Sequence, residues 1–254
     1  MRMRKLEWIC GAAVARGADT LVTCGARQSN HARLTAAASA RLGLDVVLVL
    51  AGAKGGPASG NIALNGLLGA TVTWAGDIAP EDLEPIALAI IDQLREQGAC
   101  PEFIPYGGSN TLGARGYVEC GHELLKQAED LTRVVTALGS GGTMAGLVHA
   151  LGTRRVLGVD CGAISAPAAT VAELVAGLAG APLAPEALRI RLDQVGAGYG
   201  ELTDSVMAAL TLAARTEGLV PLGASVEWCG GVCHGAEQGE YDPRTTSGTR
   251  KAPR

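Results

Sequence analysis

A short glycine-rich run, Gly139-Ser140-Gly141-Gly142-Thr143, has the composition of an anion-binding loop. It follows an apolar stretch that predicts a strand and opens a segment that predicts a helix. Glycines let backbone N–H groups approach an anion, a helix N-terminus adds partial positive charge, and the Ser140 and Thr143 hydroxyls can donate hydrogen bonds. The run therefore predicts a phosphate site, with a plain tight turn between strand and helix as the alternative.

Two familiar phosphate loops do not fit this run. No Gly-Lys-Ser/Thr follows it, so it is not a P-loop, and Met144 stands where a dinucleotide fingerprint requires its third glycine. A dinucleotide-binding module stays open as an alternative that rests on the glycine loop alone.

A second polar run, Gln28-Ser29-Asn30-His31, lies in a predicted strand-to-helix turn. Such a turn brings side chains to the carboxyl edge of a parallel sheet, where ligands bind. Ser29 or Asn30 can also cap the helix that follows, and capping is compatible with ligand binding. His31 is of a type that titrates near neutral pH, although a surface or structural histidine is the commoner case.

Strand and helix alternate along the chain, as in an α/β protein. Asn61 is the expected N-cap of the third helix, and Pro80 is expected near the first turn of the fourth. We predict helices over residues 6–17, 31–42, 61–68, 80–97, 113–129, 143–151, 167–179 and 203–217, and strands over residues 20–23, 45–50, 71–74, 103–105, 133–138 and 155–160.

The alternation divides into two blocks joined near Ala99. We predict a smaller α/β domain over residues 6–99, which carries Ser29 and Asn30, and a partial larger domain over residues 100–220, which carries the glycine loop. Residues 221–254 lack hydrophobic periodicity and form a tail foreign to the preceding domain. Cys229, Cys233 and His234 lie in that tail, but a second ligand pair is missing, so we expect no metal site.

Composition excludes several classes of partner. With 254 residues, 48% of them hydrophobic, the chain can bury a core. The formal net charge of -4 gives no overall positive field, so we expect no nucleic-acid or anionic-lipid partner. No apolar stretch reaches the roughly 18 residues of a membrane span, so we expect no membrane association.

The cysteines and the N-terminus favour a cytoplasmic protein. Seven scattered cysteines, an odd number, do not form a disulfide framework and are expected to be reduced. The short apolar run near the N-terminus is interrupted by Glu7 and Arg16, so we expect no signal peptide.

Five blocks of sequence carry a family resemblance. In the same order as here, they resemble the D-cysteine desulfhydrase and 1-aminocyclopropane-1-carboxylate deaminase family of pyridoxal-phosphate enzymes, over residues 2–220. The blocks are Arg4 to Trp8, Gln28 to Ala37, Tyr106 to Asn110, Gly139 to Gly146, and Gly198 to Gly200 continuing through Arg215 to Gly218.

The resemblance implies a fold-type II, tryptophan-synthase-β-like enzyme. Its fold would be two three-layer α/β/α domains with mostly parallel sheets, incomplete at both ends of this chain, and pyridoxal 5'-phosphate would lie between the domains. Gly139, Ser140, Gly141, Gly142 and Thr143 would hold the phosphate. Asn30 would bind the 3-hydroxyl of the cofactor, Ser29 would act in proton transfer or bind the substrate carboxylate, and His31 and Tyr199 would line the substrate side.

The implied reaction is the deamination of a small amino acid. His31 after Asn30, together with the Tyr106 to Asn110 block, favours conversion of D-cysteine to pyruvate, sulfide and ammonia. Ring opening of 1-aminocyclopropane-1-carboxylate and sulfite elimination from cysteate are the alternatives. The family resemblance also implies a homodimer.

The resemblance fails at both ends of the active site. The position matching the family's Schiff-base lysine is Arg2, whose guanidinium does not lose its proton near neutral pH. Lys5 lies about one helical turn away on nearly the same face, and we expect no imine there. The likeness ends near Val220, where we expect a change of reading frame. A non-catalytic fragment that binds pyridoxal phosphate is therefore the alternative from another class.

Overall fold

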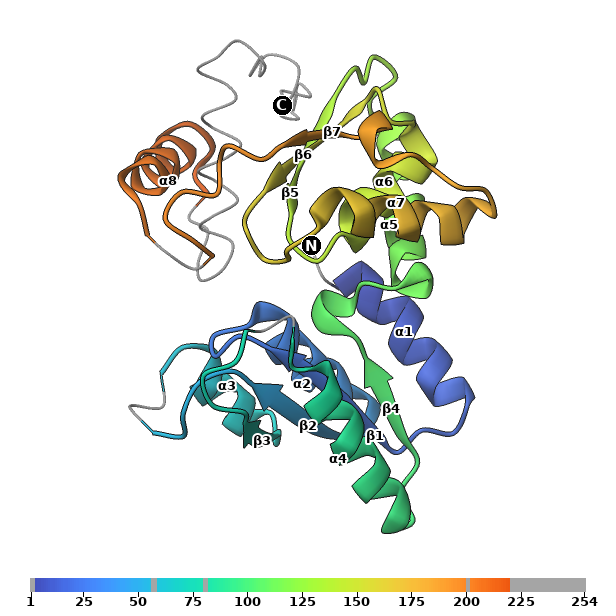
Figure 1. Cartoon of the computed structure of the whole chain (residues 1–254), viewed down its shortest axis with the longest axis vertical. Coiled ribbons are helices and arrows are strands. Elements are labelled where there is room, and N and C mark those ends of the chain that lie inside the picture. Colours follow the sequence, from blue (N-terminus) through green and yellow to red (C-terminus); the bar gives the residue numbers. More distant parts are fainter. Residues whose placement is uncertain (1–2, 56–58, 80–81, 200–201, 220–254) are drawn as a thin grey trace, which may run out of the picture. The chain divides into compact units, whose positions relative to one another are not determined.

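A computed structural model describes residues 3–55, 59–79, 82–199 and 202–219 of the chain (Figure 1). The chain forms two compact units. The first holds Met1–Tyr117 together with Ser140–Gly142, and the second holds Val118–Gly139 together with Thr143–Arg254. The Arg2 position and the tail from residue 221, with Cys229, Cys233 and His234, lie outside the described residues.

The first unit is built on a parallel sheet of four strands in the order β3-β2-β1-β4. The strands are β1 (Thr20–Gly25), β2 (Asp45–Leu50), β3 (Thr71–Trp74) and β4 (Pro101–Ile104). All six residues of β1 are buried, since it is a central strand covered on both faces.

Helices cover both faces of this sheet, so the first unit has the expected three layers. They are α1 (Met3–Ala15), α2 (Asn30–Leu42), α3 (Asn61–Leu67) and α4 (Glu84–Glu96). Alternation along β1 sends Leu21 into a core with residues of α1 and α2, and Val22 into a second core with Ala87 and Ile91 of α4.

The strand order reverses between β1 and β4. The chain moves outward from β1 to β2 and β3, and then returns through α4 to place β4 on the other side of β1. In open parallel sheets the carboxyl ends of the strands at such a switch point flank the ligand site. The fold therefore predicts a site where the chain leaves β1 and β4.

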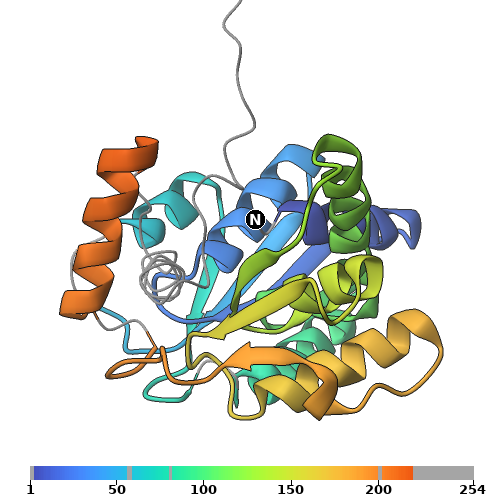
Figure 2. The same ribbon diagram turned by 90° about the horizontal axis from the view of Figure 1, so that it is seen from above.

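The second unit contains a parallel sheet in the order β5-β6-β7. Its strands are β5 (Val134–Leu138), β6 (Val156–Asp160) and β7 (Arg189–Arg191), and the helices of this part of the chain are α6 (Gly142–Leu151), α7 (Pro167–Ala179) and α8 (Asp204–Glu217). β7, the orange arrow in Figure 2, forms one edge of the sheet. Met144 of α6 is fully buried against Gly158 of β6, where a β-carbon would overlap the Met144 sulfur. α5 (Thr111–Gln127) begins in the first unit and ends in the second.

Most predicted elements are found, with four differences. The fourth helix begins at Glu84, with Leu83 as N-cap, so Pro80 is not in its first turn. β7 has only three partly exposed residues and was not predicted. Asn61 is the first residue of α3 and not its cap, because Gly60 takes that place at φ 57°.

The fourth difference is the boundary between the two blocks. It falls after Tyr117 and not near Ala99, because β4 pairs with β1 and completes the first sheet. Among the described residues, none of the helices combines the length and apolar character of a membrane span. In the same part of the chain, no three His, Cys, Asp or Glu side chains gather as metal ligands.

Candidate functional site

Most of the candidate site residues belong to the first unit, at the edge where the chain leaves β1 and β4. After β1 the chain turns through Gln28 and Ser29 into α2. After β4 it forms a single 3-10 turn, η2 (Tyr106–Gly108), followed by Ser109. The Ser140–Gly142 segment belongs to the same unit by its contacts.

Ser29 caps α2 from a buried position. Its Oγ accepts a hydrogen bond from the Ala32 N–H at 3.2 Å, and its side chain is 7% exposed. Gly25 leaves room for that side chain, since a β-carbon at Gly25 would lie 2.8 Å from the Ser29 Oγ. The capping oxygen keeps its own proton, so Ser29 retains a hydroxyl donor at the sheet edge.

Asn30 is half-buried and is held by a residue from the next helix. Asn61 Nδ2 donates to Asn30 Oδ1 at 2.9 Å and to the Gln28 carbonyl at 2.7 Å. The Gln28 side chain returns the contact, since its Oε1 accepts from the Asn61 backbone N–H at 2.8 Å. The first turns of α2 and α3 are thereby joined at the sheet edge.

His31 lies beneath the η2 turn and is 1% exposed. Thr23 Oγ1 donates its single proton to the Ile104 carbonyl at 2.8 Å, so its 3.1 Å contact with His31 must have Nε2–H as the donor. A β-carbon at Gly108 would lie 3.2 Å from His31 Cε1. The histidine therefore joins β1, β4 and η2, and its role toward substrate stays a prediction.

Lys5 of α1 supplies a buried ammonium group. Its Nζ donates to the Gly107 carbonyl at 3.0 Å and to Ser109 Oγ at 2.9 Å, and the side chain is 3% exposed. Ser109 Oγ also accepts from the Gly142 N–H at 3.1 Å and lies 2.8 Å from Ser140 Oγ. One hydroxyl thus links the lysine to the glycine loop.

Counting the hydroxyl protons of this cluster shows which hydroxyl has a hydrogen-bond donor left for a ligand. The two lone pairs of Ser109 Oγ are taken by donors from Lys5 and Gly142, so its own proton goes to Ser140. The Ser140 oxygen accepts the hydrogen bond from Ser109, so the Ser140 hydroxyl proton is available to another acceptor. Together with the lysine charge and the start of α6, this makes the loop donor-rich, as an anion site requires.

Two glycines make this cluster possible. Gly107 adopts φ 64°, and a β-carbon there would overlap the Ser140 side chain. A β-carbon at Gly142 would lie 2.7 Å from Ser109 Oγ. Gly141 adopts φ 86°, which favours glycine at the turn into α6. The glycine loop is therefore a cradle for side chains and backbone donors, and the plain-turn interpretation leaves the lysine and the two serines without an explanation.

Three predicted site residues belong to the second unit. Gly139 and Thr143 flank the cradle in sequence but belong by their contacts to the second unit. Tyr199 is a half-buried turn residue of that unit. The first unit thus contains Ser29, Asn30, His31, Ser140, Gly141 and Gly142, and the parts assigned to all nine predicted site residues stay predictions.

The sequence did not predict that Lys5, Ser109 or Asn61 takes part in ligand binding. Lys5 is the only buried lysine among the described residues, and it stands beside Leu6 and Ile9 on the apolar face of α1. A lysine on such a face was a usable signal, because a buried ammonium requires polar partners. The contacts of Ser109 and Asn61 join distant segments, and no local pattern predicts them.

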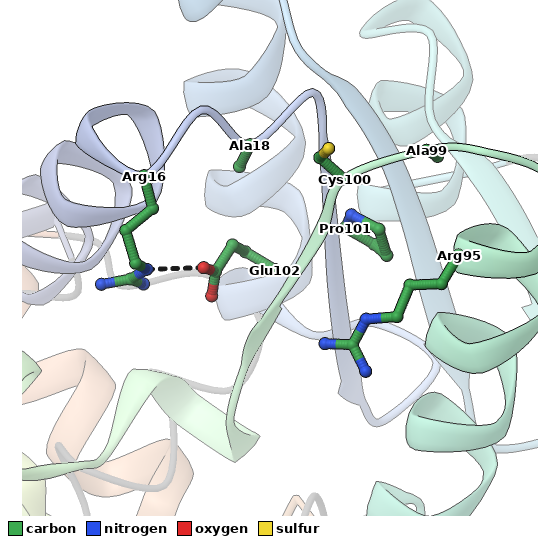
Figure 3. A pocket seen from close by; sticks show the side chains of 7 residues that line it. All are labelled: Arg16, Ala18, Arg95, Ala99, Cys100, Pro101 and Glu102. Carbon is green, nitrogen blue, oxygen red and sulfur yellow. Dashed lines mark hydrogen bonds and ion pairs between the residues drawn. The ribbon is translucent and has the colours of Figure 1, made fainter.

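A hollow in the first unit lies at the opposite, amino edge of the sheet (Figure 3). Its volume is about 230 Å³, and it is lined by Arg16, Ala18, Arg95, Ala99, Cys100, Pro101 and Glu102. Arg16 and Glu102 point toward one another, with Nε and Oε1 2.6 Å apart, while Arg95 contacts Asp92 at 3.3 Å. The guanidinium groups of this hollow already have carboxylate partners, and it does not match the chemistry of the carboxyl edge.

Comparison with known proteins decides the family. A family model described as "Pyridoxal-phosphate dependent enzyme" matches residues 1–247. The chain belongs to the pyridoxal-phosphate dependent enzymes. This assignment confirms the expected cofactor class, and the parallel α/β architecture agrees with it.

Several relatives within this pyridoxal-phosphate enzyme family are named D-cysteine desulfhydrase. The chain is 37% identical to a D-cysteine desulfhydrase from Salmonella schwarzengrund over 234 residues, covering 86% of this chain and 71% of that protein. The Salmonella typhi protein of the same name is 36% identical over equal spans. A crystal structure of an ACC deaminase homologue matches with a TM-score of 0.85 and 29% identity, over 95% of this chain and 76% of that one. O-ureido-L-serine synthase shares the fold, with a TM-score of 0.64 and 18% identity over 96% of this chain and 76% of that one.

The residues at the carboxyl edge fit the cofactor of the family. A phosphate needs converging donors, which Lys5, Ser140 and the start of α6 supply. The ring hydroxyl needs a polar partner at the same edge, and the amide of Asn30 is the predicted one. We find no conflict between this donor set and pyridoxal phosphate.

Proposed function

We propose that the chain binds pyridoxal 5'-phosphate at the carboxyl edge of the first sheet, with the phosphate against Lys5, Ser140 and the Gly141-Gly142 turn. The supporting observation is the buried Lys5 ammonium, held through Ser109 at the glycine loop. Its charge, the Ser140 hydroxyl and the N-terminus of α6 favour a dianion over a neutral ligand. The amide of Asn30 would bind the 3-hydroxyl, and Gly139 and Thr143 would complete the phosphate loop.

At this edge, protein side chains would orient the substrate and transfer protons to and from it. The pyridine ring supplies an electron sink that eases loss of the Cα proton of a bound amino acid. Ser29 has a buried hydroxyl whose oxygen caps α2, so its position is fixed while its proton remains available. We infer that Ser29 orients the substrate carboxylate or relays a proton, with His31 and Tyr199 on the substrate side.

The preferred substrate is D-cysteine. The overall reaction would be D-cysteine plus water giving pyruvate, hydrogen sulfide and ammonia, with the C–S bond and the C–N bond both broken. The names of the Salmonella relatives and the Tyr106 to Asn110 block support this choice. The named ACC deaminase homologue supports ring opening of 1-aminocyclopropane-1-carboxylate as the second candidate, and sulfite elimination from cysteate is the third.

The test has a binding arm and a substrate arm. The chain is titrated with pyridoxal phosphate and with unphosphorylated pyridoxal, and we expect saturable uptake with a strong preference for the phosphate ester. The loaded protein is then given each of the three substrates, and sulfide, 2-oxobutyrate or sulfite is measured. Absence of saturable uptake would contradict the proposed function. If the cofactor binds but 2-oxobutyrate is the only product, the substrate is 1-aminocyclopropane-1-carboxylate and not D-cysteine.

A non-catalytic pyridoxal-phosphate-binding role is the second candidate. The observation that favours it is again Lys5, because its Nζ donates hydrogen bonds to Gly107 and Ser109 in the turn that follows β4. Reduction with borohydride in the presence of pyridoxal phosphate, followed by peptide mass spectrometry, distinguishes the roles. We expect no stoichiometric phosphopyridoxyl group on Lys5, and finding one would assign that amine to the cofactor aldehyde.

We further infer a cytoplasmic protein that assembles as a homodimer. Burial raises the pKa of the Cys10 thiol to about 11 and that of Cys24 to about 12, so both are unreactive structural thiols that require no oxidising compartment. Light scattering of the purified chain measures the mass, and a monomer at micromolar concentration would contradict the dimer.

A further inference from the structure

Asn61 makes three hydrogen bonds at the start of α3. Its backbone N–H donates to Gln28 Oε1 at 2.8 Å, and its Nδ2 donates to the Gln28 carbonyl at 2.7 Å and to Asn30 Oδ1 at 2.9 Å. The residue before it, Gly60, adopts φ 57°, and a β-carbon there would lie 2.8 Å from Gln28 Oε1. The glycine therefore allows Gln28 to approach and fix the Asn61 backbone.

These contacts determine which way the Asn30 amide faces. The oxygen and nitrogen of an amide are distinguished by their partners, and a backbone carbonyl can only accept. The Asn61 atom that contacts the Gln28 carbonyl is therefore Nδ2, and its second proton requires an acceptor, which is Asn30 Oδ1. It follows that the two N–H donors of Asn30 lie on the side away from Asn61.

We propose that Asn61 is a positioning residue, which holds the Asn30 amide with its NH₂ group toward the ligand. This inference rests on the proposed function, in which Asn30 meets the 3-hydroxyl oxygen of pyridoxal phosphate. An N–H donor stabilises the ionised form of that hydroxyl, whereas an amide turned by 180° would present an oxygen and destabilise it. Asn61 thus determines whether Asn30 stabilises or destabilises the ionised hydroxyl, although Asn61 itself does not contact the ligand.

The experiment measures dissociation constants for pyridoxal phosphate in Asn61→Ala, Asn30→Ala and the double variant. We expect each single variant to bind about tenfold more weakly, because one hydrogen bond to an ionised oxygen is lost or misdirected. In the Asn30→Ala background, Asn61→Ala should have less than a twofold effect, since Asn61 acts through Asn30. An equal loss in both backgrounds would overturn the inference.

A spectroscopic readout separates positioning from packing. The absorbance of bound pyridoxal phosphate reports ionisation of its 3-hydroxyl, and we expect the midpoint pH to rise in Asn61→Ala and in Asn30→Ala alike. A pyridoxal-phosphate analogue that lacks the 3-hydroxyl should bind all variants equally. An unchanged midpoint in Asn61→Ala, alongside a raised one in Asn30→Ala, would refute the role of Asn61.

Asn61→Asp guards against a trivial folding defect. A carboxylate keeps the size of the side chain and suits the first turn of a helix, but it loses the hydrogen bond to the Gln28 carbonyl, as Asn61→Ala does, so thermal stability without cofactor is measured for both variants. It can only accept, so it would draw the Asn30 NH₂ group inward, and we expect weaker cofactor binding than in Asn61→Ala. Tight binding by a stable Asn61→Asp variant would count against the proposal.

Asn65→Ala is the matched control on the same helix. Asn65 lies one turn further along α3 and is 1% exposed, and its amide has no hydrogen-bond partner among the described residues. We expect its replacement to change stability but not cofactor affinity, and a loss of affinity equal to that of Asn61→Ala would assign both effects to packing. If the unaltered chain takes up no pyridoxal phosphate, the proposed function fails and this inference falls with it. If Asn30→Ala alone weakens uptake, only the inference fails.

Discussion

The two edges of the first sheet differ in how they use polar residues. The amino edge has a hollow of about 230 Å³ in which Arg16 is paired with Glu102 and both side chains reach solvent. At the same edge, a hydrogen bond from the Cys100 N–H holds the pKa of the exposed Asp19 carboxyl below its usual range. The carboxyl edge instead has a buried lysine that donates to the Gly107 carbonyl and to the Ser109 hydroxyl.

The proposed site therefore lies at the edge with the buried lysine and not at the edge with the open, charged hollow. At the amino edge opposite charges already neutralise each other, so little attraction is left for a ligand. At the carboxyl edge, Lys5 and Ser140 both contact the Ser109 hydroxyl, and the strand order reverses there. Four predictions test this contrast, from the largest expected effect to the smallest.

The first prediction compares two glycines with positive φ. Gly107→Val should lower pyridoxal-phosphate affinity at least about 100-fold, because its side chain would displace Ser140 and the backbone at φ 64° would be strained. Gly98→Ala, near the amino edge at φ 88° with open space around it, should reduce stability by only about 1 kcal/mol. Titration and denaturant unfolding measure both, and equal affinity in the two variants would abolish the contrast.

The second prediction compares two cations. Lys5→Met keeps the length of the side chain and removes its charge, so we expect about 30-fold weaker binding of pyridoxal phosphate, or about 2 kcal/mol. Binding of unphosphorylated pyridoxal should change less than twofold. The controls are Lys126→Met, on the exposed surface, and Arg16→Met, at the amino edge. A parallel loss for both ligands would show that Lys5 does not act on the phosphate.

The third prediction uses a buried and an exposed cysteine. Cys24 lies in β1 within the core, where desolvation raises the pKa of its thiol from its ordinary value of about 9 to about 12. The unfolded chain therefore releases this proton first, and stability falls as pH rises above about 9, by up to about 1.4 kcal/mol per pH unit for this thiol. Cys24→Ala should reduce that slope by about one proton, and Cys100→Ala, at the exposed position, should leave it unchanged. Urea unfolding from pH 8 to 10.5 measures both, and equal slopes in all three proteins would be the contrary result.

The smallest effect is expected at the Arg16 and Glu102 pair. Glu102→Gln should leave cofactor affinity unchanged and alter stability within the error of a denaturant titration, because the pair is solvent-exposed and screened by salt. The measurement is repeated at low and high ionic strength. A change in cofactor affinity in Glu102→Gln would show that the amino edge affects cofactor binding, and it would contradict the contrast between the two edges.

Sequence patterns predicted the parallel fold better than the site. The buried runs of β1 and β2 and the cap at Ser29 depend on neighbouring residues, so periodicity and capping rules reached them. The boundary near Ala99 was wrong because the pairing of β4 with β1 is a contact between distant segments. Ser109 was seen only as part of a resembling block, and its link between Lys5 and Ser140 required the folded chain.

The burial of Lys5 also has an analytical consequence. Lys54 and Lys126 are exposed and should react quickly with amine-directed reagents, whereas the ε-amine of Lys5 is enclosed by the turn that follows β4. Its rate of acetylation, followed by mass spectrometry, would therefore report how often that turn opens in the intact protein. The acetylation rate of this shielded amine would thus measure local opening at the carboxyl edge of the sheet, with no label attached to the protein beforehand.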